Sequence, residues 1–147
     1  MNRIQNESVI SLCSDNSGSS MWECNNIYMQ QQHNGWIEIA PPPLFSSDRT
    51  SFISILPSAQ ASSLRNYKHI GKQEVGGSLT FLTAGEFVVT EILSWDEAKD
   101  TIYFMGTMSE GPGARHLYSV TGASVTCLTC EIRVSRNLLI GFVNLFT

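Results

Sequence analysis

Residues 84–107, AGEFVVTEILSWDEAKDTIYFMGT, carry the strongest structural signal in this chain. Residues 87–94 form a β-branched run, residues 96–100 a polar turn, and residues 101–107 a second β-branched and aromatic run. Two such runs joined by a short polar connection are typical of a β-hairpin. No segment longer than about ten residues shows a helical repeat of apolar side chains. The sequence therefore predicts an all-β protein of antiparallel strands.

The same alternation of short strands and turns continues outward in both directions. Residues 43–83 and 85–128 repeat one order of turns and strands at a period of about 40 residues, which is the spacing of four-stranded blades. Sandwiches, barrels and propeller blades all show such short strands. The predicted strands are Val9–Cys13 and Met21–Met29, which close a hairpin, then Ser51–Leu56, Tyr67–Val75, Ser78–Leu82 and Arg115–Val120, with a loop at residues 57–66.

Composition favours a single folded domain and argues against a nucleic-acid-binding surface. The chain has 147 residues, of which 42% are hydrophobic and 15% charged, and its net charge is −4. That size and hydrophobic content suit one folded domain with a core of its own. Nine basic residues scattered along the chain form no cluster of the kind that nucleic-acid binding needs. We therefore expect no nucleic acid among its partners.

The cysteines point to an oxidising compartment. The four cysteines fall in two local pairs, Cys13 with Cys24 and Cys127 with Cys130, and an even count in local pairs favours disulfides. Asn6 begins the sequon Asn-Glu-Ser, which is glycosylated only in the secretory pathway. Together these features favour an extracellular origin.

The chain itself shows neither an export signal nor a membrane anchor. Its first 20 residues are polar from the start, so no signal peptide is predicted. The longest apolar segment, Leu138–Phe146, is about half the length that a membrane helix requires. An extracellular origin without a signal predicts a fragment or isoform of a longer protein.

Four collinear segments carry a family pattern: NRIQNESVISLC (2–13), GWIEIAPPPLFSSD (35–48), the unit at 84–107, and GPGARHLYSV with TCLTCE (111–120 and 126–131). Together they resemble the propeller domain of the dipeptidyl peptidase IV family. The resemblance implies an eight-bladed β-propeller packed on an α/β-hydrolase domain, of which residues 1–131 supply two to three blades. The family pattern also implies disulfides Cys13–Cys24 and Cys127–Cys130 and a glycosylated Asn6.

The Cys-Leu-Thr-Cys motif at residues 127–130 has three interpretations. A redox motif of the thioredoxin type opens a helix, but no helical pattern follows here. A structural zinc site needs further ligands, yet Cys13 and Cys24 have ten residues between them and no histidine near them. A structural disulfide is the favoured interpretation. We therefore predict no metal-ligating residue and no cofactor.

The catalytic residues of the family are not expected in this chain. Family exopeptidases remove N-terminal X-Pro or X-Ala dipeptides with a serine on a G-x-S-x-G elbow, a histidine and an aspartate. No such elbow occurs in the sequence, so His33, His69 and His116 are predicted to be surface or strand-packing side chains. We predict no catalytic residue. A Phe-Arg substrate contact that follows the family's Gly-Trp pair is also missing after Gly35-Trp36.

The resemblance implies two functions. The first is a fragment or short isoform of a dipeptidyl peptidase IV-like serine exopeptidase, inactive alone, whose parent cleaves peptide substrates at the plasma membrane or outside the cell. The alternative is a partner-binding propeller segment of a catalytically inactive, channel-associated member. A homodimer or a membrane-protein partner of the parent is expected in either case.

The C-terminal tail departs from the family pattern. Residues 132–147, IRVSRNLLIGFVNLFT, do not continue as family members do after Glu131, so we expect a divergent tail. Its uncharged apolar end is typical of an aggregating segment. Blades without both neighbours should also expose apolar strand residues, namely Val88, Ile92, Ile102 and Phe104.

Overall fold

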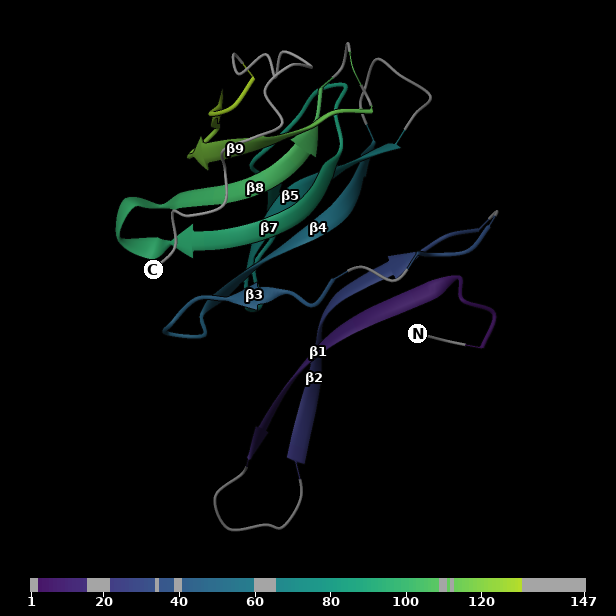
Figure 1. Ribbon diagram of the computed structural model, residues 1–147. Coiled ribbons are helices and arrows are strands. Elements are labelled where there is room, and N and C mark those ends of the chain that lie inside the picture. Colours follow the sequence, from purple (N-terminus) through teal and green to yellow (C-terminus); the bar gives the residue numbers. More distant parts are fainter. Residues whose placement is uncertain are drawn as a thin grey trace, which may run out of the picture. The chain divides into compact units, whose positions relative to one another are not determined.

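The computed structural model describes residues 3–15, 22–33, 35–38, 41–59, 66–108, 111 and 113–130. Across these residues the secondary structure is antiparallel β-sheet with one short 3₁₀ turn (Figure 1). There are three sheets: β1-β2, β3-β4-β5-β6 and β10-β9-β8-β7. The chain divides into two compact units, Met1–Leu56 with Ile70–Phe81, and Pro57–His69 with Leu82–Thr147. The predicted all-β antiparallel fold is confirmed.

The first sheet is a hairpin of β1 (Glu7–Asp15) and β2 (Trp22–Gln31). Its register pairs Glu7 with Gln31 and Cys13 with Cys24, with an irregularity after Ile10. The two cysteines face each other in this register and are joined by a disulfide. The predicted hairpin and its first disulfide are therefore both present.

The second sheet contains β3 (Leu44–Phe45), β4 (Ser51–Ala59), β5 (Asn66–Glu74) and β6 (Leu79–Phe81). Strand β4 is buried from Ser51 to Leu56, where the apolar side chains of Phe52, Ile53, Ile55 and Leu56 are interrupted only by small serines. The turn before β4 is held by Asp48, which accepts hydrogen bonds from the Ser46 and Thr50 hydroxyls at 2.6 and 2.8 Å. These bonds lower the pKa of Asp48 to about 2, and the bond from the Ser46 hydroxyl has the largest effect.

Part of the predicted loop at residues 57–66 is strand. Strand β4 continues through Pro57 to Ala59, and β5 already begins at Asn66. The predicted loop is therefore too long at both ends. Small polar residues and a proline favour a loop in sequence, but the fixed φ of proline is also compatible with an extended backbone. Pro57 is exposed and Ser58 is buried, so the alternation of a strand persists there.

The third sheet contains β7 (Val89–Asp96), β8 (Thr101–Thr107), β9 (Arg115–Thr121) and β10 (Ser124–Cys127), and Figure 1 shows β7, β8 and β9 side by side. The predicted polar turn is the 3₁₀ turn Glu97–Lys99, where the Asp96 side chain accepts a hydrogen bond from the Lys99 N–H. The Lys99 ammonium, 3.2 Å from the Asp96 carboxylate, lowers the pKa of Asp96, and the Lys99 N–H adds to this effect. Two four-stranded sheets, each with strands in chain order, confirm the predicted repeat.

An aromatic stack closes the core of the second unit. The ring of Phe104 lies 5.3 Å from that of Tyr118 and 6.4 Å from that of Phe87. Phe104 and Ile102 are fully buried, so the expectation that these two side chains are exposed is wrong. Val88 and Ile92, by contrast, are half-buried. Large exposed apolar side chains occur elsewhere, at Ile4, Trp22, Met29, Trp36, Leu44, Val75, Leu93, Val125 and Leu128.

The predicted tail, residues 132–147, lies outside the described residues. Within the described part, no helix is long and apolar enough to cross a membrane.

Candidate functional site

The three histidines lie in different environments. His33 is exposed just after β2, His69 is fully buried on β5, and His116 is half-buried on β9. These placements agree with the prediction of surface and strand-packing histidines. His69 and His116 nevertheless each take part in a specific arrangement.

His69 links β5 to the segment that precedes β7. Its Nε2 lies 3.1 Å from the carbonyl oxygen of Gly85, and its Nδ1 lies 3.1 Å from Oγ1 of Thr83. A carbonyl only accepts, so Nε2–H donates to Gly85 and the Thr83 hydroxyl donates to Nδ1 of a neutral ring. The Phe87 ring meets the imidazole edge-on, with centroids 5.0 Å apart. Burial lowers the pKa of His69 and so favours this neutral form.

The second arrangement is at the end of the β9–β10 hairpin. Strand β10 pairs with β9 from Ser124 with Thr121 to Cys127 with Tyr118, around a turn in which Gly122 has φ +60°. The Leu128 N–H continues the ladder by donating to the Leu117 carbonyl at 2.8 Å. The disulfide Cys127–Cys130 spans the corner that follows, with Cα atoms 5.7 Å apart.

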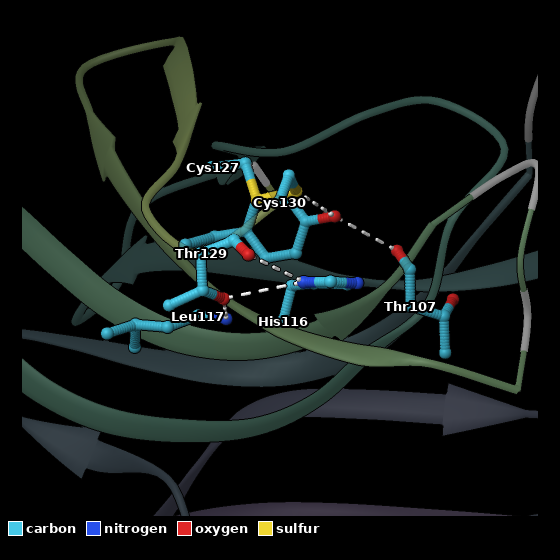
Figure 2. Close-up of a disulfide and its surroundings, with 7 residues drawn as sticks. Thr107, His116, Leu117, Cys127, Thr129 and Cys130 are labelled. Carbon is cyan, nitrogen blue, oxygen red and sulfur yellow. Dashed lines mark hydrogen bonds between the residues drawn. A yellow bond between two sulfur atoms is a disulfide. The ribbon is translucent and has the colours of Figure 1, made fainter. Parts of the chain in front are cut away.

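The corner loop packs on His116, as Figure 2 shows. Nδ1 of His116 lies 3.2 Å from the carbonyl oxygen and 3.4 Å from Oγ1 of Thr129. The Leu117 N–H donates to the same Thr129 Oγ1 at 3.0 Å. A ring nitrogen of His116 and both cysteine sulfurs lie within 4.8 Å of one another.

The hydroxyl of Tyr118 adjoins this corner. It lies 3.6 Å from Sγ of Cys130 and donates to the carbonyl of Thr107 at 3.5 Å. Burial raises the pKa of Tyr118, so the phenol remains a protonated donor.

The histidine beside the cysteines was missed by the sequence reasoning. His116 is eleven residues from Cys127 along the chain, but the hairpin places it beside the corner loop. The sequence does hold information on this position. If the pairing of β9 with β10 continues past Cys127 and Tyr118 in the same register, residue 116 lies opposite residue 129, which stands between the two cysteines in the chain. Hairpin register is set by the turn, and the strand β10 was too short to be recognised.

The first unit contains a cavity of about 310 Å³. Its walls come from the β1–β2 hairpin, from β4 and from the segment after Gly35-Trp36. Apolar side chains predominate in the lining, among them the prolines 41–43. The half-buried Tyr28, whose pKa burial raises, also lines the cavity. Trp36 itself is 78% exposed.

Comparison with known proteins identifies the family. Residues 1–137 match the profile of the dipeptidyl peptidase IV (DPP IV) N-terminal region. The chain belongs to the dipeptidyl peptidase IV family. Its antiparallel sheets are therefore blades of the family's β-propeller region, as the sequence predicted.

Individual members of the dipeptidyl peptidase IV family match nearly the whole chain. Dipeptidyl peptidase 4 of Bos taurus is 31% identical over 145 residues, and prolyl endopeptidase FAP of Mus musculus is 29% identical over 147 residues. Inactive dipeptidyl peptidase 10 of Mus musculus is 30% identical over 139 residues. These matches cover 89–92% of this chain but only 17–18% of the relatives. The chain thus spans less than a fifth of the length of its relatives.

Proposed function

We propose that this chain is the propeller part of a dipeptidyl peptidase IV-like serine exopeptidase, present as a fragment or short isoform. The observation that carries the proposal is the match of residues 1–137 to the N-terminal region of the family. The chain covers 18% of dipeptidyl peptidase 4 and has no G-x-S-x-G elbow. The whole protein removes N-terminal X-Pro or X-Ala dipeptides, and these residues supply part of its framework.

The cavity of the first unit supports a role for this region in substrate binding by the whole protein. It is lined by Ile37 and Glu38, which follow the Gly35-Trp36 pair that the family resemblance links to substrate contact. The Phe-Arg pair of active peptidases is replaced by a shorter, proline-rich segment, so peptides would meet an apolar wall here.

A second function is favoured by the same replacement. A propeller without the Phe-Arg contact suits a member that binds a partner, and inactive dipeptidyl peptidase 10 is among the relatives, at 30% identity. In that case the propeller recognises a membrane protein, or a second copy of its parent, and cleaves nothing.

The parent works at the plasma membrane or outside the cell. The disulfides Cys13–Cys24 and Cys127–Cys130 support this location, because such bonds persist in oxidising compartments. Asn6, which directly precedes β1, carries the glycan. Residues 1–131 form the partial propeller and residues 132–147 a divergent tail.

A substrate assay tests the first proposal. The purified chain is expected to release no fluorophore from Gly-Pro or Ala-Pro substrates, because no nucleophile elbow is present. Bovine dipeptidyl peptidase 4 serves as the positive control. Turnover above buffer that survives further purification would contradict the non-catalytic role.

The parent transcript separates the two functions. An intact G-x-S-x-G elbow encoded downstream of residue 131 supports the exopeptidase and excludes the partner-binding alternative. A downstream hydrolase domain whose elbow lacks the serine supports the alternative instead.

A further inference from the structure

The corner after β10 gathers three side chains that are standard zinc ligands. His116, Cys127 and Cys130 place one nitrogen and two sulfurs within 4.8 Å of one another. Two cysteines separated by two residues have the spacing found in zinc sites, and the histidine comes from the neighbouring strand. Figure 2 shows the ring of His116 beside the corner that carries the disulfide.

The corner is held in place by more than its disulfide. The Leu128 N–H donates to the Leu117 carbonyl, the Leu117 N–H donates to Thr129 Oγ1, and Nδ1 of His116 lies 3.2 Å from the Thr129 carbonyl oxygen. A disulfide that closes so short a loop restrains little of the unfolded chain, so its loss costs little stability. The three side chains therefore stay close together after reduction.

We propose that reduction of the Cys127–Cys130 disulfide turns this corner into a binding site for Zn²⁺. A dithiol supplies two electrons and two protons, which break the S–S bond and give two thiols, while the dithiol itself closes to a disulfide. Zn²⁺ then displaces the two thiol protons to solvent and binds both thiolates and one ring nitrogen of His116. The hairpin end is cross-linked in both redox states, by sulfur when oxidised and by metal when reduced.

The geometry requires only small movements. Zinc binds sulfur at about 2.3 Å and nitrogen at about 2.0–2.1 Å, so tetrahedral ligands lie roughly 3.5–4 Å apart. The freed sulfurs must separate, and the nitrogen, already within 4.8 Å of them, must approach by about 1 Å. Three protein ligands leave the fourth position for water.

Charge and hydrogen bonding favour this ion. Two thiolates and a neutral imidazole balance the charge of Zn²⁺, which suits a half-buried corner. The Tyr118 hydroxyl lies 3.6 Å from Sγ of Cys130, so after reduction its single proton can turn from the Thr107 carbonyl to the thiolate, which makes Tyr118 an outer-shell donor. Thiolate ligands select zinc and similar soft ions over Mg²⁺ or Ca²⁺.

The other disulfide provides an internal control. Cys13 and Cys24 also become thiols under reduction, but among the described residues only the His116 group brings three potential ligands together. Changing both of these cysteines to serine should therefore leave metal binding unchanged.

Cobalt titration tests the proposal on the full chain. The chain is reduced with a dithiol, desalted without oxygen and titrated with Co²⁺, a spectroscopic substitute for Zn²⁺. We expect a thiolate-to-cobalt charge-transfer band that saturates at one ion per chain and disappears on addition of Zn²⁺. The oxidised chain should show no band. Equal binding by the oxidised chain would overturn the proposal.

Variants identify the ligands. His116→Asn should weaken Co²⁺ binding by about tenfold or more, and Cys127→Ser should abolish the charge-transfer band. His116→Cys should restore tight binding with a stronger charge-transfer band, because a third thiolate replaces the imidazole, and this result separates ligation from a merely structural role. Unchanged binding in His116→Asn, or a band lost in Cys13→Ser/Cys24→Ser, would show that the site is not this corner.

Discussion

At the scale of single residues, His69 is a buried histidine whose two ring nitrogens each have a hydrogen-bond partner. Gly85 accepts from one nitrogen and Thr83 donates to the other, and neither of these groups nor Phe87 carries a charge. A proton added to Nδ1 leaves that nitrogen without a lone pair and places a charge in a buried position. The histidine is therefore a structural residue that depends on remaining neutral.

The lowered pKa of His69 predicts a loss of stability in mild acid. The folded pKa lies below the unfolded value of about 6.5, so its contribution is complete above that pH and is lost as the pH falls towards the folded pKa. The free energy of unfolding should fall by at most about 1.4 kcal/mol per pH unit from this group. Urea unfolding between pH 5 and pH 8 measures it.

Two variants complete that test. His69→Gln cannot titrate and should flatten the pH dependence, while His33→Gln, at an exposed position, should leave it as in the wild type. If His69→Gln keeps the wild-type pH dependence, another group is responsible.

At the scale of elements, the aromatic stack on β8 and β9 holds the third sheet to the segment before it. Phe104 is fully buried, and its ring forms a three-way cluster with those of Phe87 and Tyr118, whose centroids lie 6.0 Å apart. Gly106 allows this close packing, because an added Cβ would lie 3.4 Å from the rings of Phe104 and Tyr118 and 3.2 Å from the Val88 carbonyl oxygen. The stack is therefore sensitive to volume.

Truncating Phe104, the fully buried ring of the three, should lower stability. Phe104→Ala is expected to lower the free energy of unfolding by about 3–5 kcal/mol, because it leaves a cavity among rings that cannot collapse. Leu93→Ala, at a side chain that is 49% exposed, should cost under about 0.5 kcal/mol. The midpoints of urea unfolding compare the two variants, and similar midpoints would mean that the stack is not part of the core.

Most strands were predictable, and the exceptions have physical causes. The hairpins at residues 7–31 and 89–107 follow from β-branched runs separated by polar turns. Strand β3 has only two residues and β10 only four, which is too short to show the alternation of apolar and polar residues that identifies a strand. The burial of Phe104 depends in part on its contact with Phe87, which no local pattern reveals.

The candidate site was predictable only in part. The pairing of the cysteines agrees with the family resemblance, and the structure forms both bonds. The position of His116 depends on the register of a hairpin whose turn was not recognised, so its neighbours could not be inferred.

At the scale of the whole molecule, exposed apolar surface is the main liability. Trp22, Trp36 and Met29 are each more than half exposed, although single exposed apolar side chains are common. The segment Leu138–Phe146 adds a β-prone run without charge, which favours association between chains.

Removing the tail should improve solubility. We expect the full chain to self-associate and a chain ending at Glu131 to run closer to a monomer on size-exclusion chromatography under oxidising conditions. A chain ending at Asn137 is the matched control, since it keeps every residue of the family match and drops only the apolar end. A full chain that already runs as a clean monomer would place the tail within the fold.

The order of strands within the sheets also bears on how the chain is made. In both four-stranded sheets every strand pairs with the one synthesised just before or after it. Strands that are adjacent in sequence pair early in folding, because closing the short loop between them loses little chain entropy. Each blade can therefore be completed on the ribosome as soon as its fourth strand has left the exit tunnel, before the next blade exists.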